Sequence, residues 1–196
     1  MKDYWQNYID GEFIDGGAGK IQVDDPGTGR RLADQALASE KDVDRAVEAA
    51  KRVHKSCFLT DMRPVERARM VKKIGTYLLE KIDEIAPILS REAGKTLFEA
   101  RLEVTNAARY FEYYGNQAET LEGRSIPLGS TYYDFTTYEP YGISAQVIPW
   151  NFPMEMTARS LSTGLTTGNT CVIKTPELTP LTQYHYAKAV EFAGFP

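Results

Sequence analysis

Two short segments of the chain carry polar side chains suited to ligand binding, and each follows a predicted strand. Asn151 comes three residues after the end of the apolar run 143–148, and a helical pattern begins at Met154. Ligands of open α/β sheets bind at the carboxyl ends of the strands, which favours a functional role for a polar residue there. Asparagine is also common as a helix cap, so both interpretations of Asn151 stay open on residue chemistry alone.

The second segment is Lys174-Thr175-Pro176-Glu177, which follows the short apolar run 170–173. Lysine supplies mobile N–H donors, and a glutamate carboxylate is able to accept both hydroxyls of a ribose. The same residue types are also typical of a solvated surface turn with an ion pair, and by themselves they favour that structural interpretation. The functional interpretation therefore depends on the two segments acting together.

The elements around these segments alternate between strand and helix. Apolar runs predict strands at 143–148 and 170–173, and helical spacing predicts helices from Met154 to about Gly168 and over 181–193. This alternation is typical of a parallel sheet, and two strands are too few to complete a doubly wound one. We therefore expect an α/β fold that contains the first strand–helix units of a Rossmann-like parallel sheet.

The preceding residues predict a β-hairpin followed by helices. Asp10-Gly11 favours a tight turn between strands at 5–9 and 12–14. A short strand is expected at 32–36 and another at 132–138. Helical patterns with suitable first-turn residues predict helices at about 39–53, 64–92 and 96–121.

Taken together, these segments resemble the aldehyde dehydrogenase superfamily. The run Ile148-Pro149-Trp150-Asn151-Phe152-Pro153 and the run from Thr170 to Pro180 are similar to that family in order and spacing, and Gly168-Asn169-Thr170 also matches. Upstream, the segments 8–12 and 92–96 resemble the family's opening hairpin and its helix-break motif. The resemblance covers essentially the whole chain.

The resemblance implies NAD-dependent oxidation of an aldehyde to a carboxylic acid through a cysteine thiohemiacetal and a thioester. Asn151 matches the catalytic asparagine whose amide donates to the oxyanion, and loss of one such donor typically costs on the order of 3 kcal/mol in the barrier. The implied cofactor-binding residues are Ile148, Pro149, Trp150 and Asn151 beside the cofactor, and Lys174, Thr175, Pro176 and Glu177 around the adenosine ribose.

Cofactor preference and substrate contacts follow from the same resemblance. A Glu177 carboxylate that accepts from the 2′-hydroxyl would repel a 2′-phosphate, so we expect NAD rather than NADP. The helix after Asn151 is expected along the substrate channel, with Phe152, Glu155 and Arg159 as candidate substrate residues. Arg159 suits a carboxylate-bearing aldehyde. The alternative is that Glu155, four residues earlier on the same helix face, neutralises Arg159.

The resemblance places the nucleophilic cysteine, the glutamate base and a Gly-rich cofactor turn after residue 196. Cys171 lies in a predicted apolar strand and Cys57 on the first predicted helix, and we expect neither to be a nucleophile. His54 and His185 are isolated, so we expect helix-surface roles and no metal site. This chain is therefore expected to be inactive alone. The alternative is a non-catalytic interaction or oligomerisation module in which the strand 132–138 is an exposed pairing edge.

Composition restricts the partners. The chain has 23 basic and 27 acidic residues, a net charge of −4, which argues against nucleic acid or an anionic membrane surface. A cytoplasmic protein with a small-molecule aldehyde substrate is expected, because no leader segment and no run of roughly 20 apolar residues is visible. The resemblance divides the chain into an amino-terminal hairpin and helical segment (1–122), a strand and loop segment of oligomerisation type (123–142) and the first part of an NAD-binding domain (143–196). It also implies a homodimer or homotetramer for the intact protein.

Overall fold

The amino-terminal strands form a small sheet and a separate hairpin in the computed structural model, which describes residues 2–196. The three-stranded sheet has the order β1-β5-β4, from β1 (Tyr4–Trp5), β4 (Lys20–Asp25) and β5 (Arg30–Ala36). The hairpin pairs β2 (Asn7–Ile9) with β3 (Glu12–Ile14). Asp10 and Gly11 connect these two strands with φ of 58° and 77°, the left-handed conformation that the tight turn requires. The predicted hairpin is confirmed.

The next part of the chain is helical. The elements are α1 (Glu40–Lys55), α2 (Pro64–Glu80), α3 (Ile82–Ala93), α4 (Leu97–Gln117) and the short 3-10 helix η1 (Ala118–Thr120). The prediction of one helix over 64–92 is wrong, because Lys81, with φ −101° and ψ 10°, separates α2 from α3. Leu78 and Ile85 are both fully buried on either side of this break. The apolar spacing therefore continues across it and gives no sign of the interruption.

One hydrophobic core joins the helices of the amino-terminal part to those of the carboxyl-terminal part. Helix α2 packs against α4 and α6, and α4 packs against α5. Fully burying one large apolar side chain contributes roughly 2 kcal/mol. The core includes Ile74 and Leu78 of α2, Ile85 and Leu89 of α3, Phe111 of α4, Met154 and Leu161 of α5 and Ala189 of α6. The division of the chain into three segments stays a prediction.

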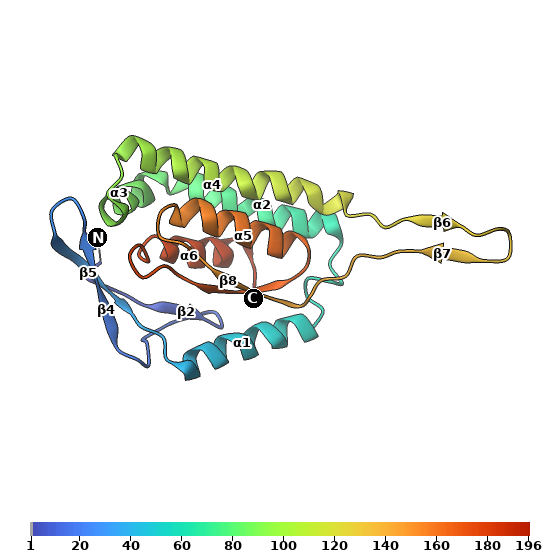
Figure 1. The fold of residues 1–196 in the computed structure, drawn as a ribbon, viewed down its shortest axis with the longest axis horizontal. Helices are drawn as coiled ribbons and strands as arrows, with labels where there is room; N and C mark the ends of the chain where they lie inside the picture. The colour runs from blue at the N-terminus through green and yellow to red at the C-terminus, as the bar shows by residue number, and fades with distance from the viewer. Residues whose placement is uncertain (1) are drawn as a thin grey trace.

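The carboxyl-terminal part contains the predicted parallel strands. Strand β8 (Ile143–Val147), helix α5 (Pro153–Thr166) and strand β9 (Thr170–Lys174) form one strand–helix–strand unit, and α6 (Gln183–Ala193) follows. Val147 lies opposite Lys174 in the register, so the two strands end level with each other. Helices α1 and α5 both contact these strands, with α1 on one side of β8 and α5 on the other (Figure 1). The mixed α/β fold with an incomplete parallel sheet is confirmed.

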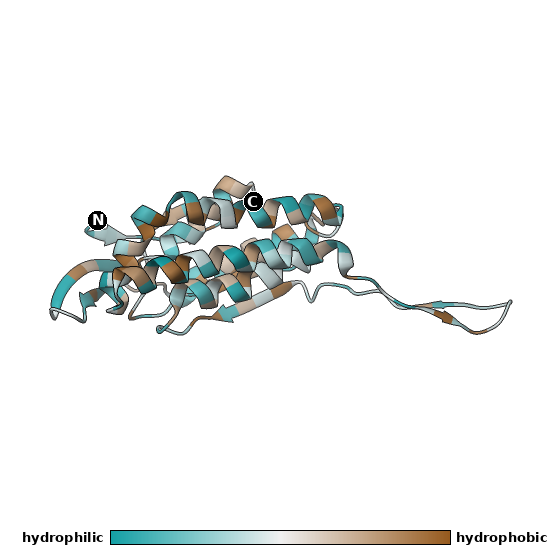
Figure 2. Cartoon of the chain, turned by 90° about the horizontal axis from the view of Figure 1, so that it is seen from above, coloured by the Kyte–Doolittle hydropathy of each residue, from teal (hydrophilic) through white to brown (hydrophobic). Residues whose placement is uncertain are grey.

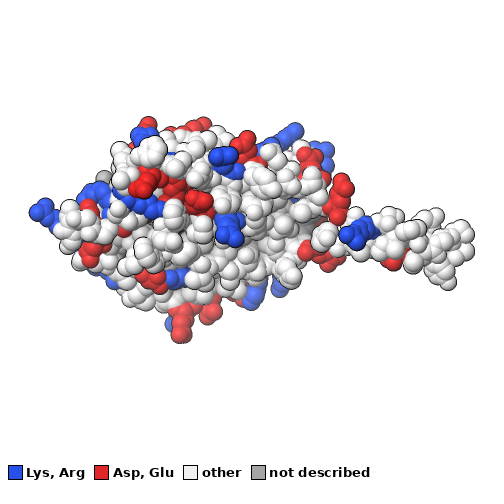
Figure 3. Space-filling view, turned by 45° about the horizontal axis from the view of Figure 1, so that its top comes forward, with Lys and Arg blue, Asp and Glu red and all other residues white. Residues whose placement is uncertain are grey.

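A β-hairpin arm projects from this body (Figures 1 and 2). It pairs β6 (Ser125–Pro127) with β7 (Tyr133–Phe135) in antiparallel fashion. The predicted strand 132–138 is thus shorter than expected, and its partner β6 lies in a stretch whose proline and glycines indicate a loop. The arm is mostly uncharged (Figure 3), and its large exposed side chains include Leu128, Tyr132, Tyr133, Phe135 and Tyr138.

None of the helices in residues 2–196 combines sufficient length with a sufficiently apolar sequence to cross a membrane.

Candidate functional site

The two segments identified in the sequence meet at one edge of the parallel sheet. The Ile148 N–H donates to the Lys174 carbonyl oxygen at 3.1 Å. The hydroxyl of the buried Thr179 donates to the Trp150 carbonyl oxygen at 2.9 Å. Thr179 has no role in the sequence-based predictions, although it joins the loop after β8 to the loop after β9. All residues predicted to bind the cofactor lie in these two loops or at the last residue of β9, namely Ile148, Pro149, Trp150, Asn151, Lys174, Thr175, Pro176 and Glu177.

Asn151 lies exposed between β8 and α5. Phe152 is the N-cap residue of α5, and no side chain of the local sequence caps this helix. The capping interpretation of Asn151 is therefore wrong. Within residues 2–196, the Asn151 amide makes no hydrogen bond to another group of the chain, so its donors remain free for a ligand oxygen.

The amino terminus of α5 is capped by a glutamate of α4. One carboxylate oxygen of Glu103 accepts from the backbone N–H groups of Met154, at 3.0 Å, and Glu155, at 3.3 Å. The other oxygen forms an ion pair with Lys95. Only 2% of Glu103 is exposed, and this burial raises the pKa of its carboxyl group, while the hydrogen bond from Lys95 acts in the opposite direction. The Lys95 ammonium also lies 3.6 Å from the centroid of the Phe152 ring.

A second buried glutamate holds the turn directly before α6. Glu92 accepts from the N–H of Leu181 at 2.7 Å and from the N–H and hydroxyl of Thr182 at 3.2 and 2.5 Å. Burial raises the pKa of Glu92 to about 7. Gly94, with φ 68°, ends α3, and Thr96 begins α4 with a capping box. The predicted helix-break segment therefore ends one helix, begins the next and supplies side chains that hold α5 and α6.

Lys174, the last residue of β9, forms an exposed ion pair with Glu177 in the loop that follows. The hydrogen bond from Lys174 lowers the pKa of Glu177, which keeps this carboxylate ionised. The structure thus brings together the two residues predicted to contact the ribose. An ion pair of this kind agrees with the surface-turn interpretation as well as with the ligand-binding one. Their position at the sheet edge that also carries Asn151 is what favours a ligand.

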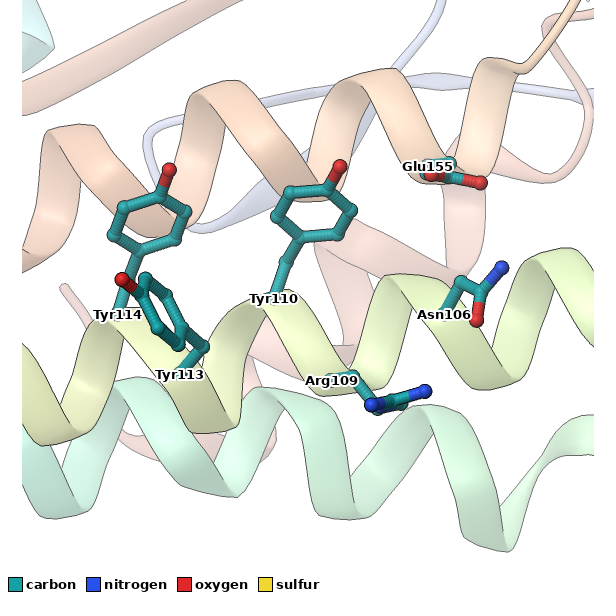
Figure 4. Close-up of a pocket in the computed structure, with 6 residues that line it drawn as sticks. All are labelled: Asn106, Arg109, Tyr110, Tyr113, Tyr114 and Glu155. Carbon is teal, nitrogen blue, oxygen red and sulfur yellow. The ribbon is translucent and has the colours of Figure 1, made fainter.

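An open pocket of about 400 Å³ lies between α4 and α5. Figure 4 shows the hydroxyls of Tyr110 and Tyr114 directed from α4 toward α5. Of the predicted substrate residues, Glu155 lines this pocket, whereas Phe152 and Arg159 do not. The complete lining is Asn106, Arg109, Tyr110, Tyr113, Tyr114 and Glu155.

The expected neutralisation of Arg159 by Glu155 is wrong. Among the described residues no ion pair joins the two side chains, although both lie on α5. Glu155 is half-buried at the pocket between the helices, and Arg159 is exposed one turn later. The four-residue spacing permits an ion pair, but Glu155 lies at the pocket between α4 and α5 instead.

The cysteines and histidines have roles that differ in part from those predicted. Cys171 is in β9, where burial raises the pKa of its thiol to about 12, so it is unsuited to act as a thiolate nucleophile. Cys57 lies beyond the end of α1, in a turn with φ 59°. His185 is not on the helix surface, because only 4% of it is exposed where α6 packs against α2, and burial lowers its pKa to about 4. His54 is half-buried on α1. The described residues contain no group of three or more suitable side chains that could hold a metal ion.

Comparison with known proteins adds independent information. Residues 13–196 match the aldehyde dehydrogenase family. An aldehyde dehydrogenase of Aspergillus niger is 35% identical over 190 residues, which cover 96% of this chain and 38% of that protein. The NADP(+) succinate-semialdehyde dehydrogenase of Saccharomyces cerevisiae is 36% identical, with coverage of 96% and 38%. The NAD+ complex of an aldehyde dehydrogenase from Bacillus cereus superimposes with a TM-score of 0.95 at 32% identity and covers 98% of this chain and 40% of that one. The chain thus spans about two fifths of the length of these relatives.

Proposed function

Because this chain belongs to the aldehyde dehydrogenase family, we propose that it contributes Asn151 and the Lys174–Glu177 pair to the NAD-dependent oxidation of an aldehyde. The observation that carries this proposal is the sheet edge itself. An exposed amide with no intramolecular partner and an ion pair lie in adjacent loops, and Thr179 and Ile148 join these loops by hydrogen bonds.

In the proposed reaction a thiolate adds to the carbonyl carbon of the aldehyde, and negative charge develops on the carbonyl oxygen. The Asn151 amide donates to this oxyanion as a neutral dipole, so that no proton has to be transferred. When bound, NAD supplies the hydride acceptor. Water then hydrolyses the resulting thioester to the acid. The thiol of Cys171 is buried and Cys57 lies in the turn after α1, so this proposal assigns the thiolate to neither of them.

Lys174 and Glu177 would hold the adenosine ribose of the cofactor. An ionised Glu177 accepts hydrogen bonds from ribose hydroxyls and repels a 2′-phosphate, which supports NAD as the preferred cofactor. The exposed ammonium of Lys174 is available to donate to the same hydroxyls. The ion pair between these side chains keeps both groups at one place in the loop before the cofactor arrives.

The arm formed by β6 and β7 supports a second role in assembly. We propose that it pairs with a second copy of the chain, because exposed aromatic side chains and two short, solvent-facing strands are unfavourable in isolation. The same observation supports the alternative function, a non-catalytic oligomerisation module built on this scaffold.

Calorimetric titration of NAD into the chain tests the cofactor part of the proposal. We expect measurable binding that is weakened in Lys174→Met. The matched control is Lys188→Met, because Lys188 also pairs with a glutamate three residues later, Glu191, and lies on α6 away from the sheet edge. The absence of any heat change at millimolar NAD, or equal effects of the two variants, would overturn this part of the proposal.

A further inference from the structure

We propose that Lys95 and Glu103 are positioning residues that hold the backbone around Asn151 in one conformation and so set the place from which its exposed amide projects. This inference rests on the proposed function, because that function gives the Asn151 amide its role. It concerns residues that lie 48 to 56 positions before Asn151 in the sequence and on different elements.

The first step concerns the amino terminus of α5, which follows Asn151 by two residues. The first N–H groups of a helix have no partners within the helix, and here Phe152 and Pro153 offer no side-chain cap. Glu103 replaces the missing local cap with a carboxylate that bonds Met154 and Glu155. A buried carboxylate at a helix amino terminus is favoured by the helix dipole, so the first turn of α5 is held firmly against α4.

The second step concerns Phe152, the residue that directly follows Asn151. Its side chain is 44% exposed and is therefore not fixed by burial. The Lys95 ammonium lies over one face of the ring at 3.6 Å, where the electrostatic attraction between cation and ring is favourable. Because the same ammonium pairs with the buried Glu103, Lys95 cannot move away from the ring without breaking an ion pair.

The third step combines the two sides of Asn151. On the preceding side, Thr179 holds the Trp150 carbonyl oxygen. On the following side, Lys95 holds Phe152. The backbone at Asn151 is thus fixed from both directions, although its own side chain is exposed and makes no bond to the chain. An oxyanion donor requires both a fixed backbone and a free amide. A donor that is already in place avoids reorganisation during the reaction, and a donor without an intramolecular partner is free to bind the oxyanion.

Nitrogen-15 relaxation of the 196-residue chain provides a test that does not depend on activity. We expect the Asn151 backbone amide to have an order parameter near 0.85 in the wild type and below about 0.6 in Lys95→Met. Lys95→Arg should restore the order, because it keeps both the charge and the contact with the ring. The matched control is Lys72→Met, which removes a lysine that donates to Asn116 on α4. This control should leave Asn151 unchanged.

Phe152→Leu keeps the inference testable if loss of Lys95 prevents folding. It removes the ring but leaves the Lys95–Glu103 ion pair. Because Phe152 is partly exposed, we expect this variant to fold. We expect the same loss of order at Asn151 and no further loss in the double variant with Lys95→Met. Unchanged order parameters at Asn151 in a folded Lys95→Met or Phe152→Leu protein would overturn the inference. A failure of NAD to bind would count against the proposed function alone, because the relaxation measurement needs no cofactor.

Discussion

The hydroxyl of Thr179 lies 2.9 Å from the carbonyl oxygen of Trp150, and this hydrogen bond connects two loops that each follow a strand of the parallel sheet. The bond is buried at Thr179 and ends one residue before Asn151. The loop that carries Lys174 and Glu177 is therefore mechanically coupled to the loop that carries the amide. Several properties of the chain should depend on this connection.

Replacing Thr179 by valine should weaken both folding and NAD binding. Valine has a similar shape but leaves the Trp150 carbonyl oxygen without its donor, which we expect to lower the free energy of unfolding by about 1 kcal/mol. Urea denaturation and calorimetry measure the two effects. Thr105→Val is the control, because Thr105 makes a similar bond to a backbone oxygen within α4. Equal NAD affinities in both variants would contradict the proposed coupling.

Glu103→Ala should destabilise the chain by about 3 kcal/mol or more, because it removes the cap of α5 and leaves Lys95 without its partner in a mostly buried position. Thermal and urea denaturation report this loss. Glu112→Ala, at an exposed position of the same helix, should stay within about 0.5 kcal/mol of the wild type. Similar stabilities of the two variants would show that the buried carboxylate is not needed as a cap.

The stability of the chain should depend on pH through Glu92. Its pKa is about 7 in the folded protein, against an ordinary value of 4.5. Between these values the folded state retains a proton that the unfolded state has released. The contribution of Glu92 to the free energy of unfolding therefore falls as pH rises from about 4.5 to about 7, by on the order of 3 kcal/mol, and is constant above that range.

Comparison of the wild type with Glu92→Gln isolates this effect from the other carboxylates. The variant cannot titrate at this position, so the difference between the two unfolding free energies should change between about pH 4.5 and about pH 7 in favour of the variant at the higher pH. Urea denaturation at several pH values gives the curves. Parallel curves for the two proteins would mean that Glu92 titrates at its ordinary value.

Glu177→Gln should reduce the preference for NAD over NADP. A neutral amide accepts only through one oxygen and no longer repels a 2′-phosphate, so we expect NAD to bind about tenfold more weakly and the gap to NADP to narrow. Titration of both cofactors gives the ratio of dissociation constants. Glu191→Gln, which removes the carboxylate of the comparable pair with Lys188, should leave that ratio unchanged. Tighter binding of NADP than NAD by the wild type would reject the expected preference.

The arm should control self-association without affecting folding. Tyr133 is 95% exposed, so Tyr133→Ser should change the free energy of unfolding by less than about 0.5 kcal/mol. Sedimentation velocity should show oligomers for the wild type and a shift toward monomer for this variant. Tyr113→Ser, at an exposed tyrosine on α4, serves as the control. A wild type that stays monomeric at all concentrations would count against pairing through the arm.

The sequence predicts best the elements whose conformation is determined by residues within the same short segment. Asp10-Gly11 supplies the turn of the hairpin, and the apolar runs at 143–148 and 170–173 become β8 and β9. The break at Lys81 lacks a local signal, because the residues on both sides face the same core. The burial of His185 was missed for a related reason. Its neighbours on α6 do not indicate that α2 covers them.

The two buried glutamates were also missed, although a signal was present. Glu92 continues the buried stripe of Ile85 and Leu89 on α3, and Glu103 lies beside the buried Ala100 and Val104 on α4. An acidic residue on an apolar helix face indicates a buried carboxylate that needs donors. The sequence cannot identify these donors, because they lie in the first turn of α5 and in the turn before α6, 51 and 89 residues away.

These caps also determine how the protein tolerates exchange of segments with its relatives. The carboxylates on α3 and α4 depend on backbone donors near the starts of α6 and α5. A gene crossover anywhere between residues 104 and 152 separates these acceptors from their donors. Because the arm is exposed, a chimera joined within it would not be expected from the arm alone to disturb the packing of the protein. It would nevertheless combine the acceptors of one parent with the donors of the other, and it should remain viable only when the parent that supplies the amino-terminal part has acidic residues at positions 92 and 103.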